Sequence, residues 1–530
     1  MWARFYAKDL RIIAHYLGIM ILFMGAIMLA PLLVSCVMQE WETSVHYVMG
    51  IGCALSIGAL LRLAKINTGQ MERRHAIAVT GLIWIVGALF AALPLWLSGH
   101  YSSFLDSFFE GVSGLTATGF SLVQDLDHMS TADNMWRFIL QFLGGQGVVV
   151  IAMALGLFTQ VGSSFYNAEG RQEAVLPSVA KTARFIWAFS ATVVLIGTII
   201  LTAILLLSGM EPVRSLFHGL WLTIGSYDTG GFAPQSSSFI YYHSWPLEIV
   251  AMIFMCLGAI NFALYARIQR GHWREFTKDI EVRTLGIWTF IMIVAFVAAV
   301  CAGTYLTDYL SLLRRGLFTI VSATTNAGYQ VLSTNQITTM LTSGAFFLIT
   351  IATAIGGSAG STAGGIKAMR VGIIFKGLSL RIKAVLLPQS AQTNTRYNHI
   401  GQHLLTNELL SASLVIAALY VITYLIGTLA GIACGYEAIH SMFESISATS
   451  NAGLSSGLAA PDAPVIMKVV YILQMWMGRL EFLSLLALGA SLFLSLRPQR
   501  RVLHPHTTPR KIFRTKRNAV QQEAQESGDK

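Results

Sequence analysis

The feature that most constrains this chain is a series of apolar stretches, each about as long as a lipid bilayer's hydrocarbon core is thick. A helix needs about 20 apolar residues to cross that core, and it must pair its own backbone amides because lipid offers no partners. Of the 530 residues, 54% are hydrophobic and only 12% charged, and the mean hydropathy is +0.61. Soluble domains carry about 25% charged residues. We therefore predict an all-α polytopic membrane protein.

These stretches give ten candidate spans. The first follows a short basic start, as in a cleaved signal peptide. It is longer than a typical signal-peptide apolar region and lacks a clear small-residue cleavage site, so we expect a retained span. The predicted spans are residues 12–38, 45–63, 76–98, 134–158, 183–208, 245–268, 284–306, 340–375, 405–432 and 464–496.

The formal net charge of +10 raises the question of a nucleic-acid partner. The lysines and arginines are instead gathered in every second loop, as in residues 62–74, 267–283 and 376–383. This alternation is the positive-inside signature, and it predicts a multi-pass protein of the cytoplasmic (inner) membrane with both termini in the cytoplasm and no nucleic-acid partner. The five cysteines are isolated and lack metal-ligand spacing, so we interpret them as packing residues.

One predicted span cannot be a uniform helix. Residues 340–375 are interrupted at 356–365 by a run made only of Gly, Ser, Ala and Thr, which we call the glycine-rich loop. Such residues are tolerated at membrane depth only where the backbone is buried in protein or lines a wet cavity. We therefore expect an irregular segment within the membrane.

Four external connections share a pattern of a helix-like piece followed by small and hydroxyl residues that end in glycine. They follow the third, fifth, seventh and ninth spans, and their glycines recur at intervals of 112, 97 and 125 residues. A unit of span, re-entrant loop and span is therefore used four times. The four re-entrant loops are residues 113–120, 225–232, 322–329 and 447–454, with their glycines at Gly119, Gly231, Gly328 and Gly453.

This composition suits the dehydration of an alkali cation. Backbone carbonyls replace the water shell without the strong binding of carboxylates, glycine lets them turn inward, and Ser and Thr add hydroxyl oxygens. Half-helices would also direct their negative C-terminal ends at the ion. Small residues in a single loop are better explained by close helix packing, but four matching loops favour an ion pathway. The candidate ion ligands are Thr116, Ala117, Thr118, Gly119, Asp228, Thr229, Gly230, Gly231, Thr325, Asn326, Ala327, Gly328, Ser450, Asn451, Ala452 and Gly453.

With these loops the chain resembles the Trk/Ktr/HKT superfamily of potassium transporters, and within it the TrkH-type membrane subunits. The likeness covers roughly residues 1–496 and also rests on residues 142–148, on 356–367 with Arg370, and on 478–481. It implies four span/re-entrant-loop/span repeats around a pseudo-fourfold pore. The implied divisions are two extra transmembrane helices in 1–70, pore repeats in 71–165, 166–275, 276–390 and 391–496, and a basic cytoplasmic tail in 497–530.

The resemblance also implies a function and partners. It implies potassium uptake through a filter of backbone carbonyls, with K⁺ as the transported ion, no organic cofactor and no enzymatic activity. A homodimer, a cytosolic nucleotide-binding regulatory subunit and membrane lipid are the implied partners. A serine at the first filter glycine is associated with sodium transport in this superfamily, so Gly119 points to potassium. The third repeat would contain an intramembrane gating loop, formed here by Gly356, Gly357, Gly360, Gly364, Gly365 and Lys367.

Asp228 departs from the pattern, because its equivalents in the other loops are Thr116, Thr325 and Ser450. Its carboxylate either raises cation affinity at the outer mouth or caps a backbone turn. The sequence leaves both interpretations open.

Lys367 and Arg479 fall inside predicted spans, where a charged side chain is costly and is functional by default. The alternative is that they snorkel to the interface. We hypothesise that Arg479 hydrogen-bonds to carbonyls of the glycine-rich loop and helps that loop block the pathway at rest.

Glu110 and Glu444 both stand nine residues before a loop glycine. They either concentrate cations at the entrance or are ordinary half-helix charges. A proton- or sodium-coupled secondary transporter is the alternative function. An enzyme is weakly supported, because the glycine-rich loop lacks the Gly-Lys-Ser/Thr ending of a phosphate cradle. For the tail we expect disorder near anionic lipid.

Overall fold

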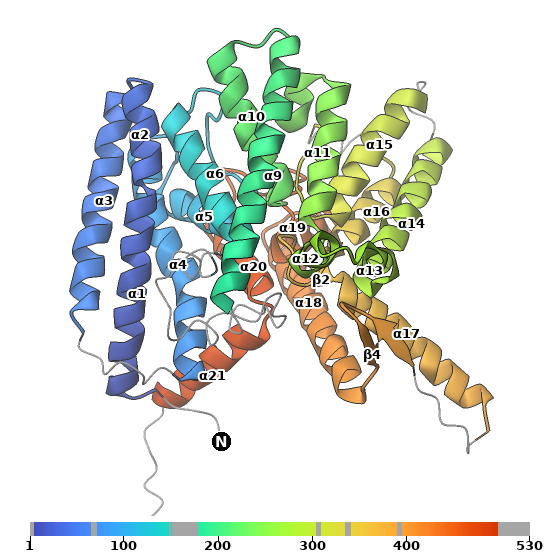
Figure 1. The fold of residues 1–530 in the computed structure, drawn as a ribbon. Coiled ribbons are helices and arrows are strands. Elements are labelled where there is room, and N and C mark those ends of the chain that lie inside the picture. Colours follow the sequence, from blue (N-terminus) through green and yellow to red (C-terminus); the bar gives the residue numbers. More distant parts are fainter. Residues whose placement is uncertain are drawn as a thin grey trace, which may run out of the picture.

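The computed structural model describes residues 5–64, 72–147, 150, 179–303, 309–333, 336, 341–388 and 395–496. Within these ranges the chain is mostly helical, and its helices stand side by side in one bundle (Figure 1). The predicted class, an all-α polytopic membrane protein, is confirmed. The predicted basic tail at 497–530 and the last part of the span predicted at 134–158 lie outside the described residues.

Three helices flank the bundle at one edge (Figure 1). Helix α1 (Ala7–Ile27) continues into α2 (Leu29–Val37), and α3 (Trp41–Arg62) runs beside α1. Small residues let α1 and α3 approach closely, since a methyl group on Gly18 would lie 2.7 Å from the Gly58 carbonyl oxygen. Leu33 on α2 and Leu60 on α3 are about two-thirds exposed, as expected of side chains that face lipid.

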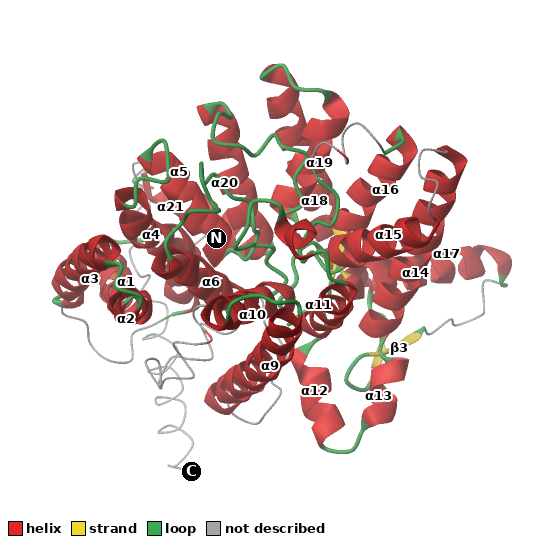
Figure 2. Cartoon of the chain, turned by 90° about the horizontal axis from the view of Figure 1, so that it is seen from above, coloured by secondary structure: helices red, strands yellow, loops and turns green. Residues whose placement is uncertain are grey.

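Four units of similar construction follow, each with a long helix, a short helix ending inside the molecule, a re-entrant loop and a return helix. Seen from above, the units succeed one another around a common centre (Figure 2). The long helices are α4 (Arg73–Leu97), α9 (Val179–Leu207), α14 (Ile280–Gly303) and α18 (Asn407–Ala433). The short helices are α5 (Phe104–Leu115), α10 (Pro212–Tyr227), α15 (Tyr309–Thr324) and α19 (Ala438–Thr449). The return helices begin with α6 (Thr131–Gln146), α11 (Trp245–Gly258), α16 (Ser343–Ala354) and α20 (Val465–Arg479).

Within the described ranges, six helices are individually long and apolar enough to cross a membrane, and up to eight spans result if each of two bent helix pairs counts as one. The bent pairs are α11 with α12 (Phe262–Gln269), at 94°, and α20 with α21 (Leu483–Leu496), at 113°. The spans predicted at 245–268 and 464–496 are therefore each broken into two helices. Glycine and left-handed residues cause the breaks: Gly258 ends α11, while Glu481 and Phe482 have φ of +54° and +61°, which a right-handed helix excludes.

The glycine-rich loop interrupts the third return helix, as its composition predicted. Helix α16 ends at Ala354, and α17 (Ala368–Leu386) begins after the loop. Strands β1 (Ile355–Gly356) and β2 (Ile366–Lys367) pair in parallel and close the base of the loop. The loop is therefore an ordered part of the bundle.

The remaining elements connect the units. A 3₁₀ helix, η1 (Ser238–Tyr242), follows the second re-entrant loop, and α13 (Trp273–Lys278) joins α12 to α14. An antiparallel hairpin of β3 (Arg396–Asn398) and β4 (Gln402–Leu404) lies between α17 and α18.

Candidate functional site

The four re-entrant loops have the same backbone conformation. The residue two positions before each glycine is left-handed, with φ between +49° and +55° for Ala117, Thr229, Asn326 and Asn451. The glycines follow with φ from +75° at Gly231 to +94° at Gly119. A left-handed L-residue costs roughly 1–2 kcal/mol, so four such residues in equivalent positions indicate a geometry that the fold imposes.

The turn directs the amide groups of each loop back to its short helix. In the first loop the N–H groups of Thr116, Ala117 and Thr118 donate to helix carbonyls at 2.8, 2.9 and 2.8 Å, and the same three bonds recur in the other loops. Among the described residues, no protein group hydrogen-bonds to the carbonyls of residues 117–119, 229–231, 326–328 or 451–453. Twelve carbonyl oxygens are thus left for another partner.

The loops form a closed ring in chain order. A methyl group added to the glycine of each loop would collide with a backbone carbonyl oxygen of the next loop, and the fourth loop meets the first. The added carbon would lie 2.1 Å from the Gly230 oxygen if placed on Gly119, and 2.9 Å from the Ala327 oxygen if placed on Gly231. It would lie 2.2 Å from the Ala452 oxygen if placed on Gly328, and 2.1 Å from the Thr118 oxygen if placed on Gly453. The structure therefore brings together the sixteen residues that the sequence proposed as ion ligands.

Two loop hydroxyl groups are held in place by donating hydrogen bonds to helix carbonyls, and their oxygen lone pairs are still able to accept. Thr116 Oγ1 donates to the carbonyl of Val112 at 2.8 Å, and Thr325 Oγ1 donates to the carbonyl of Val321 at 2.6 Å. A hydroxyl that donates its proton to a helix still has acceptor capacity for a cation. The deep ends of the first and third loops are thus able to add hydroxyl oxygens to the carbonyls.

The carboxylate of Asp228 lies at the C-terminal end of α10, the deep end of the second loop, and is fully buried. Its Oδ1 accepts a hydrogen bond of 2.7 Å from Nε2 of Gln146, and a methyl group on Gly145 would lie 2.6 Å from its Cβ. The carboxylate is therefore enclosed within the bundle, and an effect on cation affinity stays a prediction. The group joins the second unit to the end of α6 in the first.

The glycine-rich loop lies against the deep ends of three re-entrant loops. A methyl group on Gly364 would lie 2.0 Å from the Ser450 carbonyl oxygen, and one on Gly356 would lie 2.0 Å from Oδ1 of Asn326. The hydroxyl of Thr362 donates to the carbonyl of Tyr227 at 3.0 Å. These contacts leave no space for a side chain at Gly356 or Gly364.

The other predicted loop residues are also packed in place. Gly360 and Gly365 are left-handed, with φ of +70° and +68°. A methyl group on Gly357 would lie 2.7 Å from the carbonyl oxygen of Ala259 at the α11 break. Lys367 is buried and donates to the Ala363 carbonyl, so it does not snorkel to an interface.

Arg479 is the last residue of α20 and reaches two other units. Its Nη1 donates to the carbonyl of Thr362 at 2.9 Å, which is the contact hypothesised from the sequence. Its Nη2 donates to the carbonyls of Gly144 and Gly145, the second at 3.0 Å. The guanidinium group therefore links the glycine-rich loop to the end of α6. A role for this link in gating stays a prediction.

The sequence as a whole also matches a known protein family. The family model for TrkH, described as a cation transport protein, matches residues 44–495. The chain belongs to the TrkH family. Members of this family are transport proteins, so the expectation that the chain is not an enzyme is confirmed, as is the resemblance inferred from the loops.

Individual relatives match this TrkH-family chain over most of its length. An uncharacterised cation transporter of Methanocaldococcus jannaschii is 29% identical, covering 92% of this chain and 96% of its own. The Trk system potassium uptake protein TrkH of Halomonas elongata is 28% identical, covering 92% and 99%. The crystal structure of the potassium transporter TrkH from Vibrio parahaemolyticus has the same fold, with a TM-score of 0.76, 24% identity, and coverage of 90% and 98%.

Sequence reasoning missed a second set of repeated glycines in this TrkH-family chain. A methyl group on Gly144, Gly258 or Gly478 would lie 1.9–2.1 Å from the carbonyl oxygen that ends the short helix of the same unit. Each glycine lies 25 or 27 residues after its loop glycine. Aligning the return helices as well as the loops would have found this signal.

Glu110 and Glu444 are fully buried, so neither lies free at an entrance, as one sequence interpretation proposed. Glu110 Oε1 accepts from Nε of Arg137 at 2.8 Å, and its Oε2 accepts from the N–H of Leu122 at 2.9 Å. Glu444 Oε1 alone accepts from the N–H and hydroxyl groups of residues 455–458. Both carboxylates tie the ascending part of a re-entrant loop to its short helix.

Replacing each of these two glutamates with glutamine is expected to lower the free energy of unfolding by different amounts. Glu110→Gln removes the charge partner of the fully buried Arg137, and we expect the free energy of unfolding to fall by about 3–5 kcal/mol. Glu444→Gln retains an oxygen at the Oε1 position, where all the bonds are made, so we expect a loss of less than about 1 kcal/mol. Denaturant unfolding of the two purified variants measures this difference. Equal losses would contradict the assignment of the ion pair.

Proposed function

We propose that the chain takes up potassium across the cytoplasmic membrane through the ring of loop carbonyls, with the glycine-rich loop as the gate. The observation that carries this proposal is the closed contact of four loops with one shared backbone conformation. The names of relatives from Halomonas elongata and Escherichia coli, both potassium uptake proteins of the Trk system, support potassium as the ion.

The ring would act as a selectivity filter by replacing the water shell of the ion. Carbonyl oxygens have a moderate field and bind a monovalent ion weakly enough to release it. The four re-entrant loops approach one another without side chains between them, because each has a glycine at the contact: Gly119, Gly231, Gly328 and Gly453. The C-terminal ends of α5, α10, α15 and α19 point their negative dipole ends at the same region, which favours a cation.

The glycine-rich loop would block the pathway beneath the filter at rest. Arg479 holds it through Thr362, and Lys367 closes its base at Ala363. Conduction would require the loop to leave the deep ends of the re-entrant loops and the Arg479 bond to Thr362 to break. The small residues of the glycine-rich loop suit such a movement, because they have little side-chain bulk to collide with neighbouring segments as the loop moves.

The proposal extends to assembly and topology. We propose a homodimer of this chain in the inner membrane, both termini in the cytoplasm, and a cytosolic nucleotide-binding regulatory subunit that acts on the glycine-rich loop. The positive-inside distribution of Lys and Arg supports the topology, and the Trk-system names of the relatives support the regulatory subunit. The repeat boundaries at 71, 166, 276 and 391 belong to the same proposal.

Uptake measurements test this function directly. In a host that lacks its own potassium transporters, the chain is expected to restore growth at low potassium and to carry rubidium inward. Glu248 and Glu481 are each paired with an arginine, Arg314 and Arg370, so we expect no dependence of flux on an imposed proton gradient. Flux that follows the proton gradient would support coupled transport, and no uptake in the presence of the regulatory subunit would contradict the proposal.

A further inference from the structure

A compact group of metal-ligating side chains lies apart from the ion pathway. Asp279 and Glu281 stand at the start of α14, and His399 lies in the turn between β3 and β4. The three side chains come from segments about 120 residues apart and are all nine-tenths or more buried. Burial of two carboxylates is costly unless a positive charge or several donors accompany them.

The histidine presents one ring nitrogen to both carboxylates. Nδ1 of His399 lies 3.0 Å from Oδ2 of Asp279 and 3.8 Å from Oε2 of Glu281. A single hydrogen on Nδ1 makes one well-aligned bond, and here it faces two acceptors. A cation placed among the three atoms would lie within reach of both carboxylates and the imidazole.

The ligand set matches a divalent transition cation. Two carboxylates supply two negative charges, and the imidazole nitrogen favours zinc over the hard cations magnesium and calcium. All three ligand atoms lie within 4.8 Å of one another. Ligands at the usual zinc distances of about 2.0–2.2 Å stand roughly 3.3 Å apart in a tetrahedron, so small side-chain movements suffice.

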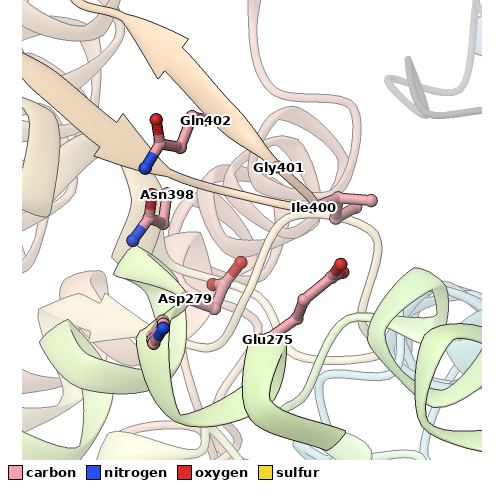
Figure 3. Close-up of a pocket in the computed structure, with 7 residues that line it drawn as sticks. Glu275, Asp279, Asn398, Ile400, Gly401 and Gln402 are labelled. Carbon is pink, nitrogen blue, oxygen red and sulfur yellow. The ribbon is translucent and has the colours of Figure 1, made fainter. Parts of the chain in front are cut away.

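A cavity lies beside this group of side chains. It has a volume of about 230 Å³ and is lined by Asp279 together with Glu275 and Asn398 (Figure 3). Figure 3 shows Asp279 beneath the hairpin that carries Asn398 and Gly401. The cavity therefore reaches one of the three side chains, Asp279.

We propose that Asp279, Glu281 and His399 form a binding site for one divalent transition cation, for which Zn²⁺ is the probe. The site would hold the β3–β4 hairpin against the start of α14. Its ligands would be Oδ2 of Asp279, Oε2 of Glu281 and Nδ1 of His399.

The site is connected to the glycine-rich loop. Oε1 of Glu281 accepts the N–H of Ala359 at 2.7 Å, and Oε2 accepts from Nδ2 of Asn261 at 3.3 Å. Asn261 in turn caps α12 at the break of the second return helix. A metal bound to Glu281 would fix the carboxylate that holds Ala359. This consequence rests on the proposed gating function, whereas the metal binding does not.

Zinc titration of the untagged, purified full chain tests the site. Wild type is expected to bind one Zn²⁺ per chain by calorimetry. His399→Ala removes a direct ligand and should weaken this binding at least ~100-fold, since even outer partners are worth 10–100-fold. Asp279→Asn retains an oxygen that is able to accept the Glu281 N–H, and should weaken binding at least about tenfold. His403→Ala, on the exposed strand of the same hairpin, is the matched control and should bind as wild type.

If a variant fails to fold, X-ray absorption of zinc bound to wild type still tests the site, because it reports the zinc ligands directly. One imidazole nitrogen with oxygen ligands at about 2.0–2.2 Å is expected. A shell with two or more imidazoles, or equal zinc binding by wild type and folded His399→Ala, would overturn the site. Zinc is also expected to lower rubidium flux through wild type but not through His399→Ala. An unchanged flux would overturn only the link to the loop.

Discussion

Replacing Gly119 with alanine is expected to reduce rubidium uptake by on the order of 100-fold. The added methyl group would lie 2.1 Å from the Gly230 carbonyl oxygen and 2.9 Å from the backbone of Gly231. No side chain is available to move aside, so the second loop itself must shift by roughly 1 Å. A shift of that size in a preorganised site costs about 100-fold. Uptake per correctly folded transporter, quantified by size-exclusion chromatography, is the measurement.

Gly435→Ala is the matched control for this substitution. Gly435 has φ of +92°, close to the +94° of Gly119, but nothing lies within 4 Å of the position of its added methyl group. The control therefore introduces the same left-handed strain, about 1–2 kcal/mol, without the collision. We expect its uptake to stay within about twofold of wild type. Equal loss in both variants would show that strain, and not closure of the ring, limits transport.

Arg479→Ala is expected to raise the basal rubidium flux at least about tenfold when the regulatory subunit is absent. The substitution removes the charged hydrogen bond to Thr362 and those to Gly144 and Gly145. Each such bond is worth about 1.5–3 kcal/mol, and 1.4 kcal/mol shifts a closed–open equilibrium tenfold. These bonds reach Thr362, Gly144 and Gly145, which lie outside the four re-entrant loops, so we expect the potassium-to-sodium ratio to stay as in wild type. Flux into proteoliposomes measures both quantities.

Two further variants separate the geometry of Arg479 from its charge. Arg479→Lys keeps the positive charge but loses the planar fork that reaches Thr362 and Gly145 together, so an intermediate flux is expected. Arg381→Ala removes an exposed arginine on α17 and should leave the basal flux as in wild type. A basal flux unchanged in Arg479→Ala would mean that this link does not hold the gate.

The re-entrant loops were predictable from sequence because their signal is local and repeated. Small and hydroxyl residues ending at Gly119, Gly231, Gly328 and Gly453 recur in four units, and each loop makes its turn with its own helix. The glycine-rich loop was predictable for the same reason, since no membrane helix accommodates such a run.

Apart from the bond from Arg479 to the glycine-rich loop, the destinations of single polar side chains were not predictable. Asp228 meets Gln146, which is 82 positions away, and His399 meets Asp279, 120 positions away. Such pairs depend on how the units pack, and a single sequence contains no record of that packing. The breaks after Gly258 and Arg479 were missed because their flanking residues are apolar and read as one continuous span.

A density map of the full chain in rubidium, compared with one in an ion-free buffer, tests the central claim most directly. The account predicts a rubidium peak on the axis of the ring, surrounded by carbonyl oxygens from all four re-entrant loops, and absent from the ion-free map. A map in which rubidium sits elsewhere, or in which the carbonyls of one or more loops face away from the common axis, would contradict it.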